Sequence, residues 1–254
     1  MKLGEWYETA FDADYLQRYS HRNREEAERG VRLLARHLPE GFRGPAFDLC
    51  CGAGRHALAL REAGIATTGG DLSHPLLRSA ARAAAGAGHS LPLVRLDMRH
   101  LPLRDRVFRL VTNFFTAFGY FETDEENFAV LAEVARVLEP GGWFLLDFLN
   151  REPALHATKQ TPHERFPSET PGGVWLIQRS ISPDGRRALK HQQEWVDGVP
   201  GREVWESVRL YSPAELEQAI ARSGLAVVHR WGDYTGEPLD PEASSRCILL
   251  ARRQ

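Results

Sequence analysis

The segment 47–55 constrains the fold more than any other part of the chain. An apolar strand there is expected to end in Asp48, and a tight turn that contains Gly52 and Gly54 follows. Glycine tolerates positive φ and lets the backbone approach a ligand without a Cβ clash. Helix-forming residues begin at Arg55, and the free N–H groups of a helix start point into the space in front of it. We therefore predict a strand, a ligand-binding loop and a helix.

Acidic residues also close the next two predicted strands, which end at Asp71 and Asp97. Three consecutive strands with an aspartate near each carboxyl end are typical of the ligand-binding edge of an open α/β sheet. Strands and helices continue to alternate up to residue 150, which indicates crossover connections and a parallel sheet. The predicted strands cover 46–50, 65–71, 91–97, 107–114 and 143–149, and the helices lie near 55–64, 74–85 and 124–138.

The pattern changes over 151–210, where segments joined by turn signals alternate apolar and polar residues. This alternation predicts an inserted antiparallel β meander. Its three strands are expected over 174–181, 187–197 and 202–210. The predicted fold is therefore α/β: a doubly wound, Rossmann-like, mostly parallel sheet of seven main strands with the meander inserted.

The two ends of the chain complete this prediction. Ser212 and Glu215 form a capping box around Pro213, which predicts a helix start, and strands follow over 225–231 and 245–252. Residues 1–40 predict an amphipathic helical cap in which Ser20 or Asn23 begins a helix that continues to Leu38. An aromatic cluster ahead of that helix either packs on the main sheet or covers a ligand pocket. Its members are Trp6, Tyr7, Phe11, Tyr15 and Tyr19.

Bulk composition excludes several classes of protein. The formal net charge is -2, so no electrostatic argument favours nucleic acid or an anionic membrane. No apolar run reaches the roughly 20 residues of a membrane span, and no signal peptide is apparent. Three cysteines cannot build a disulfide framework, which favours a reducing, cytoplasmic location. The adjacent pair Cys50-Cys51 lacks the spacing of a metal site, so no metal is expected.

Two kinds of nucleotide ligand could bind at the predicted carboxyl edge of the sheet. A dinucleotide site wants Gly-x-Gly-x-x-Gly, but Ala57 stands at the third position. Asp71 suits either ligand, because both carry an adenosine ribose whose hydroxyls a carboxylate can bind. Asp48 on the first loop would repel a pyrophosphate, whereas it could meet the ammonium of S-adenosylmethionine directly or through water. The residues therefore favour S-adenosylmethionine.

These motifs resemble those of the class I S-adenosylmethionine-dependent methyltransferases, most clearly over 40–150. The segment 48–54 is similar to the acidic, glycine-rich loop of that family, with Cys50 in place of its first glycine; Cys50 is expected to fit if its φ stays negative. The resemblance implies one methyltransferase domain over 1–254 that binds S-adenosylmethionine and releases S-adenosylhomocysteine. The cofactor-binding residues that it implies are Tyr15, Arg22, Asp48, Cys50, Gly52, Gly54, Asp71, Leu72, Asp97, Met98 and Asn113.

Within that resemblance, Asp71 binds the ribose and Leu72 packs on adenine. Asp97 accepts from the adenine amino group, while the Met98 N–H donates to the ring. Alternative interpretations stay open, because Asp48 could instead cap a helix or pair with Arg55. Asn113 could likewise satisfy the backbone at a strand end.

The molecule that accepts the methyl group is harder to predict than the cofactor. The 113–121 segment lacks the Asn/Asp-Pro-Pro-Tyr/Phe pattern of nucleic-acid amino methylation, so a small molecule with a nitrogen or oxygen nucleophile is favoured. An RNA or protein methyltransferase and a nicotinamide-dependent reductase are the alternatives. The meander is expected to roof the acceptor pocket or to mediate a homodimer. No catalytic residue stands out; candidate bases are His21, His56, Tyr15, Tyr19 and Glu206.

Overall fold

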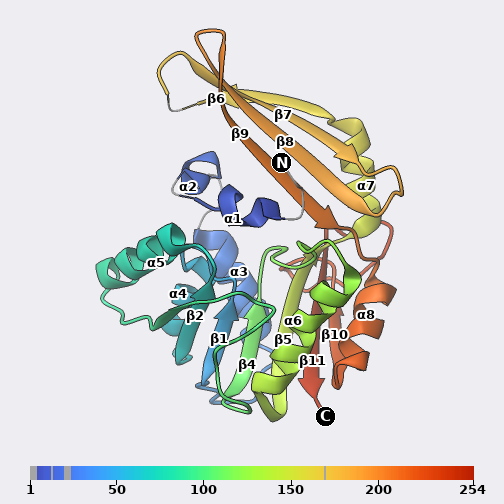
Figure 1. Cartoon of the computed structure of the whole chain (residues 1–254). Coiled ribbons are helices and arrows are strands. Elements are labelled where there is room, and N and C mark those ends of the chain that lie inside the picture. The colour runs from blue at the N-terminus through green and yellow to red at the C-terminus, as the bar shows by residue number, and fades with distance from the viewer. Residues whose placement is uncertain (1–4, 13, 20–23, 169) are drawn as a thin grey trace.

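The computed structural model describes residues 5–12, 14–19, 24–168 and 170–254. Its main sheet has seven strands in the order β10-β11-β5-β4-β1-β2-β3, which confirms the predicted class (Figure 1). Strands β1 to β5 pair in parallel, and β11 runs antiparallel to both β5 and β10. The chain reverses direction across the sheet between β1 and β4, where open α/β sheets bind ligands. The strands are β1 (Ala46–Leu49), β2 (Thr67–Asp71), β3 (Leu93–Arg95), β4 (Phe108–Asn113), β5 (Leu138–Leu149), β10 (Leu225–Trp231) and β11 (Arg246–Arg253).

Helices cover both faces of this sheet, and each face has its own hydrophobic core. Alternate residues of a strand point to opposite faces. Leu110 and Leu145 thus pack in the core under α3 and α4, whereas Val111 and Phe144 pack in the core under α6 and α8. The helices are α3 (Arg24–Ala35), α4 (Arg55–Glu62), α5 (His74–Gly86), α6 (Asp124–Val137) and α8 (Pro213–Arg222). The capping box predicted at Ser212 is present at the start of α8.

An antiparallel sheet of four strands, which we call the inserted sheet, stands above the main sheet (Figure 1). It consists of β6 (His163–Pro167), β7 (Gly173–Ile181), β8 (Arg187–Val196) and β9 (Val199–Arg209), and α7 (Arg151–Gln160) precedes it. The predicted meander corresponds to β7–β9. Sequence analysis missed β6 and α7, which are short and carry mostly exposed side chains, so neither has a strong hydrophobic period.

The N-terminal segments lie between the two sheets (Figure 1). They form the short helices α1 (Trp6–Ala10) and α2 (Tyr15–Arg18). Trp6 and Tyr7 are buried, and the ring of Trp6 meets that of Tyr120 with centroids 4.9 Å apart. Trp6 and Tyr7, the first two residues of the aromatic cluster, therefore pack in the hydrophobic core. The predicted helix caps Ser20 and Asn23 lie outside the described residues.

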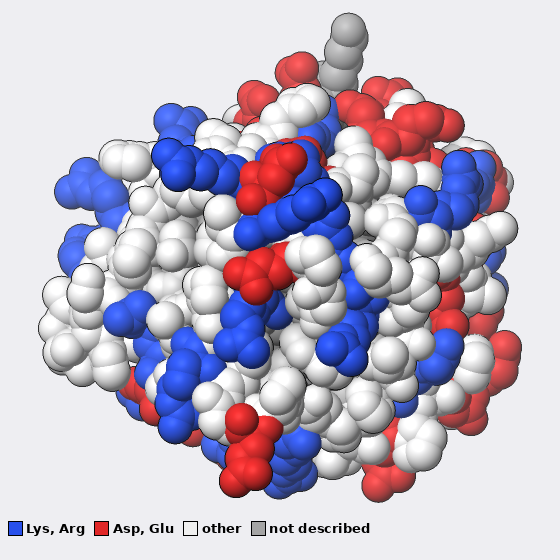
Figure 2. Space-filling view, turned by 90° about the horizontal axis from the view of Figure 1, so that it is seen from below, with Lys and Arg blue, Asp and Glu red and all other residues white. Residues whose placement is uncertain are grey.

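No helix in the described part of the chain is long and apolar enough to cross a membrane. Figure 2 shows the face opposite the inserted sheet, where basic and acidic side chains are mixed.

Candidate functional site

A cavity of about 320 Å³, which we call the first cavity, lies at the carboxyl ends of β1, β2 and β4. Its size falls within the range of small-molecule sites. The loop after each of these strands contributes to its wall, together with α1, α2 and the residues around them. The lining residues are Tyr7, Phe11, Tyr15, Leu16, Tyr19, Cys50, Cys51, Gly52, Ala53, Arg55, His56, Asp71, Leu72, Leu76, Leu96, Asp97, Met98, Phe114, Phe115, Ala117, Tyr120 and Phe121.

The loop after β1 turns through three residues with positive φ: Cys50 at 59°, Gly52 at 54° and Gly54 at 81°. The condition of a negative φ at Cys50 is therefore not met: Cys50 adopts the left-handed conformation that favours glycine. Burial raises the pKa of the Cys50 thiol and that of the Cys51 thiol well above the ordinary value of a cysteine. Both stay protonated and are poor nucleophiles.

Asp71 joins the end of β2 to this loop. Its Oδ2 accepts from the Gly52 N–H at 2.8 Å, and its Oδ1 accepts from the Ser73 N–H at 2.8 Å. Burial raises the pKa of Asp71, and these backbone donors oppose the rise. The carboxylate therefore lines the first cavity with its orientation fixed by the chain's own backbone.

Asp97 and Met98 lie at the third loop, and Arg99 orients the carboxylate. Arg99 Nη2 is 2.7 Å from Asp97 Oδ2, and its guanidinium lies over the Phe121 ring at 4.3 Å. Partial burial acts to raise the pKa of Asp97, but Arg99 outweighs this effect and lowers it. Met98 Sδ is 3.4 Å from Cys50 Sγ, so the first and third loops touch.

Three of the predicted residues that the structure describes are not in the wall of the first cavity. Asp48 is buried beneath the loop, and its Oδ1 accepts from Thr112 Oγ1 at 2.8 Å. Asn113 donates to the carbonyls of Leu49 and Ala117, which matches the alternative interpretation that it satisfies backbone groups. Gly54 begins α4. Arg22 lies outside the described residues.

Many of the lining residues outside the predicted cofactor-binding set are aromatic. Phe114 and Phe115 follow β4, with Tyr120 and Phe121 shortly after, and Tyr7 comes from α1. The sequence contained a signal for these residues, because the N-terminal aromatic cluster and the aromatic residues of the 113–121 segment can be read from it directly. Their convergence on one cavity depends on the tertiary packing of α1 and α2.

His56 is buried in the wall of the first cavity and stacks on Phe114, with centroids 4.1 Å apart. Burial lowers its pKa well below the ordinary value, and the nearby Arg55 and Arg246 act in the same direction. Its Nε2 has no hydrogen-bond partner among the described residues. His56 is thus a neutral imidazole in the cavity wall, and no described residue satisfies its Nε2.

Asp147 at the end of β5 holds the loop after β4. Phe115 and Thr116 are consecutive non-glycine residues with φ of 62° and 63°, an unfavourable arrangement that needs support. Asp147 Oδ2 accepts from the Phe115 N–H, and its carbonyl accepts from the Thr116 N–H, both at 2.8 Å. Arg246 Nε donates to Asp147 Oδ1 at 2.5 Å, and Tyr234 also donates to this carboxylate.

A second cavity of about 590 Å³ lies beside the first. The two cavities share four aromatic residues: Phe11, Tyr15, Phe115 and Tyr120. Most of the other residues in the wall of the second cavity belong to α7 and the inserted sheet. Its other lining residues are Trp6, Thr116, Leu149, Ala154, Ala157, Thr158, Thr161, Glu164, Arg179, Ala188, Leu189, Lys190, Glu206 and Val208.

A polar cluster connects the walls of the two cavities. Tyr19, in the wall of the first, donates to Glu206 Oε1 at 2.5 Å, and Glu206 belongs to the second. The same oxygen accepts from Gln192 Nε2 at 2.8 Å, and Lys190 Nζ lies 3.5 Å from it. Among the described residues, no group of three or more potential ligands gathers to hold a metal ion.

Similarity to known proteins agrees with this geometry. A family model described as a methyltransferase domain matches residues 46–142. YqeM of Bacillus subtilis (strain 168), which is provisionally named as a methyltransferase, is 33% identical over 216 residues, or 84% of each chain. The dTDP-3-amino-3,4,6-trideoxy-alpha-D-glucopyranose N,N-dimethyltransferase of Streptomyces venezuelae is 28% identical over 82% of this chain and 85% of its own.

A solved structure extends the similarity to the whole fold. The CcbJ methyltransferase from Streptomyces caelestis superposes with a TM-score of 0.77 at 20% identity, over 100% of this chain and 99% of that chain. The shared architecture therefore includes the inserted sheet as well as the main sheet. The motifs, the fold and the relative at 33% identity agree with one another. The chain belongs to the class I S-adenosylmethionine-dependent methyltransferases.

Proposed function

We propose that the enzyme binds S-adenosylmethionine in the first cavity and methylates a nitrogen or oxygen nucleophile of a small molecule held in the second. One observation carries this proposal: the two cavities adjoin and share Phe11, Tyr15, Phe115 and Tyr120. A ligand in each would meet at these rings. The curated relatives support a small acceptor, since one of them is named for methylating a nucleotide-linked amino sugar.

The residues of the first cavity suit the proposed cofactor. Asp71 would hold the ribose hydroxyls, and Asp97 with the Met98 N–H would hold the adenine, against Leu72. The loop at Cys50 and Gly52 would follow the amino-acid part, because both residues line the first cavity. The buried Asp48 would act on the ammonium through the loop. Gly54 and Asn113 would support the loops that form the wall, and Tyr15 and Arg22 would cover the cofactor.

The chemistry demands orientation more than acid–base catalysis. The cofactor supplies a methyl group that is activated by its bond to a sulfonium. When this methyl group is transferred, the sulfur becomes a neutral thioether. The chain would contribute the alignment of the acceptor and the exclusion of water, for which the shared aromatic rings are suited; orientation alone is worth roughly 7–11 kcal/mol in favourable cases. A protonated nucleophile would also need a base. Tyr19 and Glu206 are the best placed, because they link the two cavities.

Two further features of the protein stay proposals. We propose a cytoplasmic site of action, which the three free cysteines support. A homodimer through the inserted sheet would use the exposed apolar residues Leu176 and Val199. Sedimentation equilibrium tests it: a dimer that Val199→Lys converts to monomer supports this interface, and a monomeric wild type contradicts it.

The cofactor class is tested by calorimetric titration of the purified protein with S-adenosylhomocysteine and, separately, with NADH. We expect micromolar binding of the first and none of the second, because the loop after β1 departs from the dinucleotide pattern Gly-x-Gly-x-x-Gly at Ala57. Binding of NADH with no response to S-adenosylhomocysteine would overturn the proposal. A screen of metabolites with a labelled methyl donor then identifies the acceptor.

Asp71→Ala is expected to weaken S-adenosylhomocysteine binding on the order of a hundredfold, or about 3 kcal/mol, because it removes two charge-assisted hydrogen bonds to the ribose. Asp105→Ala is the control, since the Asp105 side chain is 68% exposed at a distant surface position. Unchanged affinity in Asp71→Ala would remove Asp71 from the site.

A further inference from the structure

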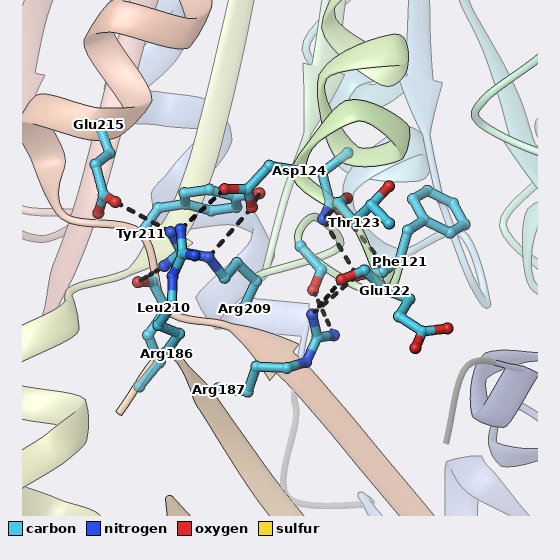
Figure 3. Close-up of polar contacts among 12 residues, drawn as sticks. Phe121, Glu122, Thr123, Asp124, Arg186, Arg187, Arg209, Leu210, Tyr211 and Glu215 are labelled. Atoms are coloured by element: carbon cyan, nitrogen blue, oxygen red, sulfur yellow. Dashed lines mark hydrogen bonds and ion pairs between the residues drawn. The ribbon is translucent and has the colours of Figure 1, made fainter. Parts of the chain in front are cut away.

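Arg187 connects the inserted sheet to the loop that follows β4. This residue begins β8, and its guanidinium points at the backbone carbonyls of residues 119–122 (Figure 3). Nη1 donates to the Phe121 carbonyl at 2.9 Å and lies 3.5 Å from that of Glu122. Nη2 reaches the carbonyls of Gly119 at 3.4 Å and Tyr120 at 3.3 Å. One side chain thus gathers four successive carbonyls.

The other side of the guanidinium is fixed to the inserted sheet. Arg187 Nε donates to Ser207 Oγ at 2.8 Å, and Nη2 donates to the Ser207 carbonyl at 2.9 Å. Ser207 is a buried residue of β9. Because the planar guanidinium offers its donors in a rigid fork, it can bridge two segments in one orientation, which an ammonium cannot do.

The neighbouring contacts join the same two segments. The Arg209 N–H donates to the Gly119 carbonyl at 2.8 Å. Gly119 has φ of 79°, and a Cβ there would come within 3.0 Å of the Arg209 carbonyl. Tyr211 Oη donates to Asp124 Oδ1 at the start of α6 at 2.6 Å, and Arg209 Nε donates to the same oxygen at 3.2 Å (Figure 3). The base of the inserted sheet and residues 119–124 therefore form one packed unit.

The loop of residues 119–122, whose carbonyls Arg187 binds, also carries side chains that line the first cavity. Tyr120 lines both cavities, and Phe121 lines the first. The Phe121 ring also lies against the Arg99 guanidinium, which binds Asp97. A continuous series of contacts therefore runs from Arg187 through Phe121 and Arg99 to the carboxylate proposed for adenine. No residue of the inserted sheet itself is among those that line the first cavity.

We propose that Arg187 is a positioning residue for cofactor binding. By fixing the carbonyls of residues 119–122, it holds Tyr120 and Phe121 against the cofactor, so the inserted sheet sets cofactor affinity without touching the cofactor. This inference rests on the proposed function, because it takes the first cavity as the cofactor site.

The test measures S-adenosylhomocysteine affinity by calorimetry in Arg187→Lys, with thermal unfolding followed in parallel. Lysine keeps the charge but loses the fork, and we expect affinity to fall about tenfold as the loop loosens. The matched control is Arg186→Gln: Arg186 is the preceding residue, is 53% exposed and contacts Asp124 but no carbonyl of 119–122, so affinity should stay within about twofold of wild type. Ser207→Ala, which removes only the acceptor for Nε, should weaken binding less and in the same direction.

A double-mutant cycle with Phe121→Leu separates positioning from a general effect on folding. If Arg187 acts through Phe121, Arg187→Lys has less effect on affinity in the Phe121→Leu background than in wild type. Equal effects in both backgrounds, or unchanged affinity in Arg187→Lys, overturn the inference. A wild type that does not bind S-adenosylhomocysteine is a different result, because it contradicts the proposed function itself.

Discussion

Replacing Asp147 with alanine is expected to lower the free energy of unfolding by about 3–5 kcal/mol, the usual cost of removing one partner from a buried ion pair. Asp147 is fully buried, and its carboxylate binds Arg246, Tyr234 and the Phe115 N–H. Burial acts to lower the pKa of Arg246, but Asp147 outweighs that effect and holds the pKa above its ordinary value. Without the carboxylate, the largely buried Arg246 guanidinium loses its ion-pair partner, and the strained loop at Phe115 loses a hydrogen-bond acceptor.

Urea unfolding measures this loss, and Asp147→Asn should fall between alanine and wild type because it keeps an accepting oxygen. The control is Glu217→Ala, which removes the carboxylate from an exposed pair with Arg230 at 2.6 Å. Exposed pairs are worth at most about 1 kcal/mol, so the control should change little. Equal losses from Asp147→Ala and Glu217→Ala would show that the Asp147 network does not support the loop after β4.

Asp48 is expected to make stability depend on pH in the direction opposite to most carboxylates. Burial raises the pKa of Asp48 to about 7, although the Thr112 hydrogen bond acts to lower it. The folded protein therefore retains a proton that the unfolded chain releases near pH 4, and stability from this group falls as the pH rises toward 7. At about 1.4 kcal/mol per pH unit, the loss over that interval is about 4 kcal/mol.

Asp48→Asn removes the titrating group while keeping nearly the same shape. Unfolding of both proteins from pH 4 to pH 8 should therefore show the variant gaining stability relative to wild type as the pH rises. A constant difference between the two would mean that Asp48 is ionised throughout. If Asp48 acts on the cofactor's ammonium, binding of S-adenosylhomocysteine near pH 6 should also release a proton from wild type and not from Asp48→Asn.

The sequence was most informative where local patterns determine structure. The three aspartates Asp48, Asp71 and Asp97 located the carboxyl ends of the first three predicted strands, although β2 is built from threonine and glycine rather than from an apolar run. The capping box at Ser212 is a local pattern as well. The wall of the first cavity therefore contains Asp71, Asp97 and Gly52, as expected from the carboxyl ends of adjacent strands.

What the sequence could not show depends on contacts between distant segments. Cys50 adopts a glycine-like φ, and the packing of its thiol on Met98 could not be read from the loop alone. The left-handed pair Phe115–Thr116 relies on Asp147, about 30 residues away in the sequence. Arg187 looked like an ordinary polar residue of an alternating strand, yet its partners are carbonyls more than 60 positions earlier.

The most direct test of the account is a crystal structure of the protein with S-adenosylhomocysteine. We expect the compound to lie along the first cavity, with the ribose hydroxyls on the Asp71 carboxylate and the adenine beside Asp97 and Met98. An empty first cavity at saturating concentration, or the compound bound elsewhere on the protein, would contradict the account.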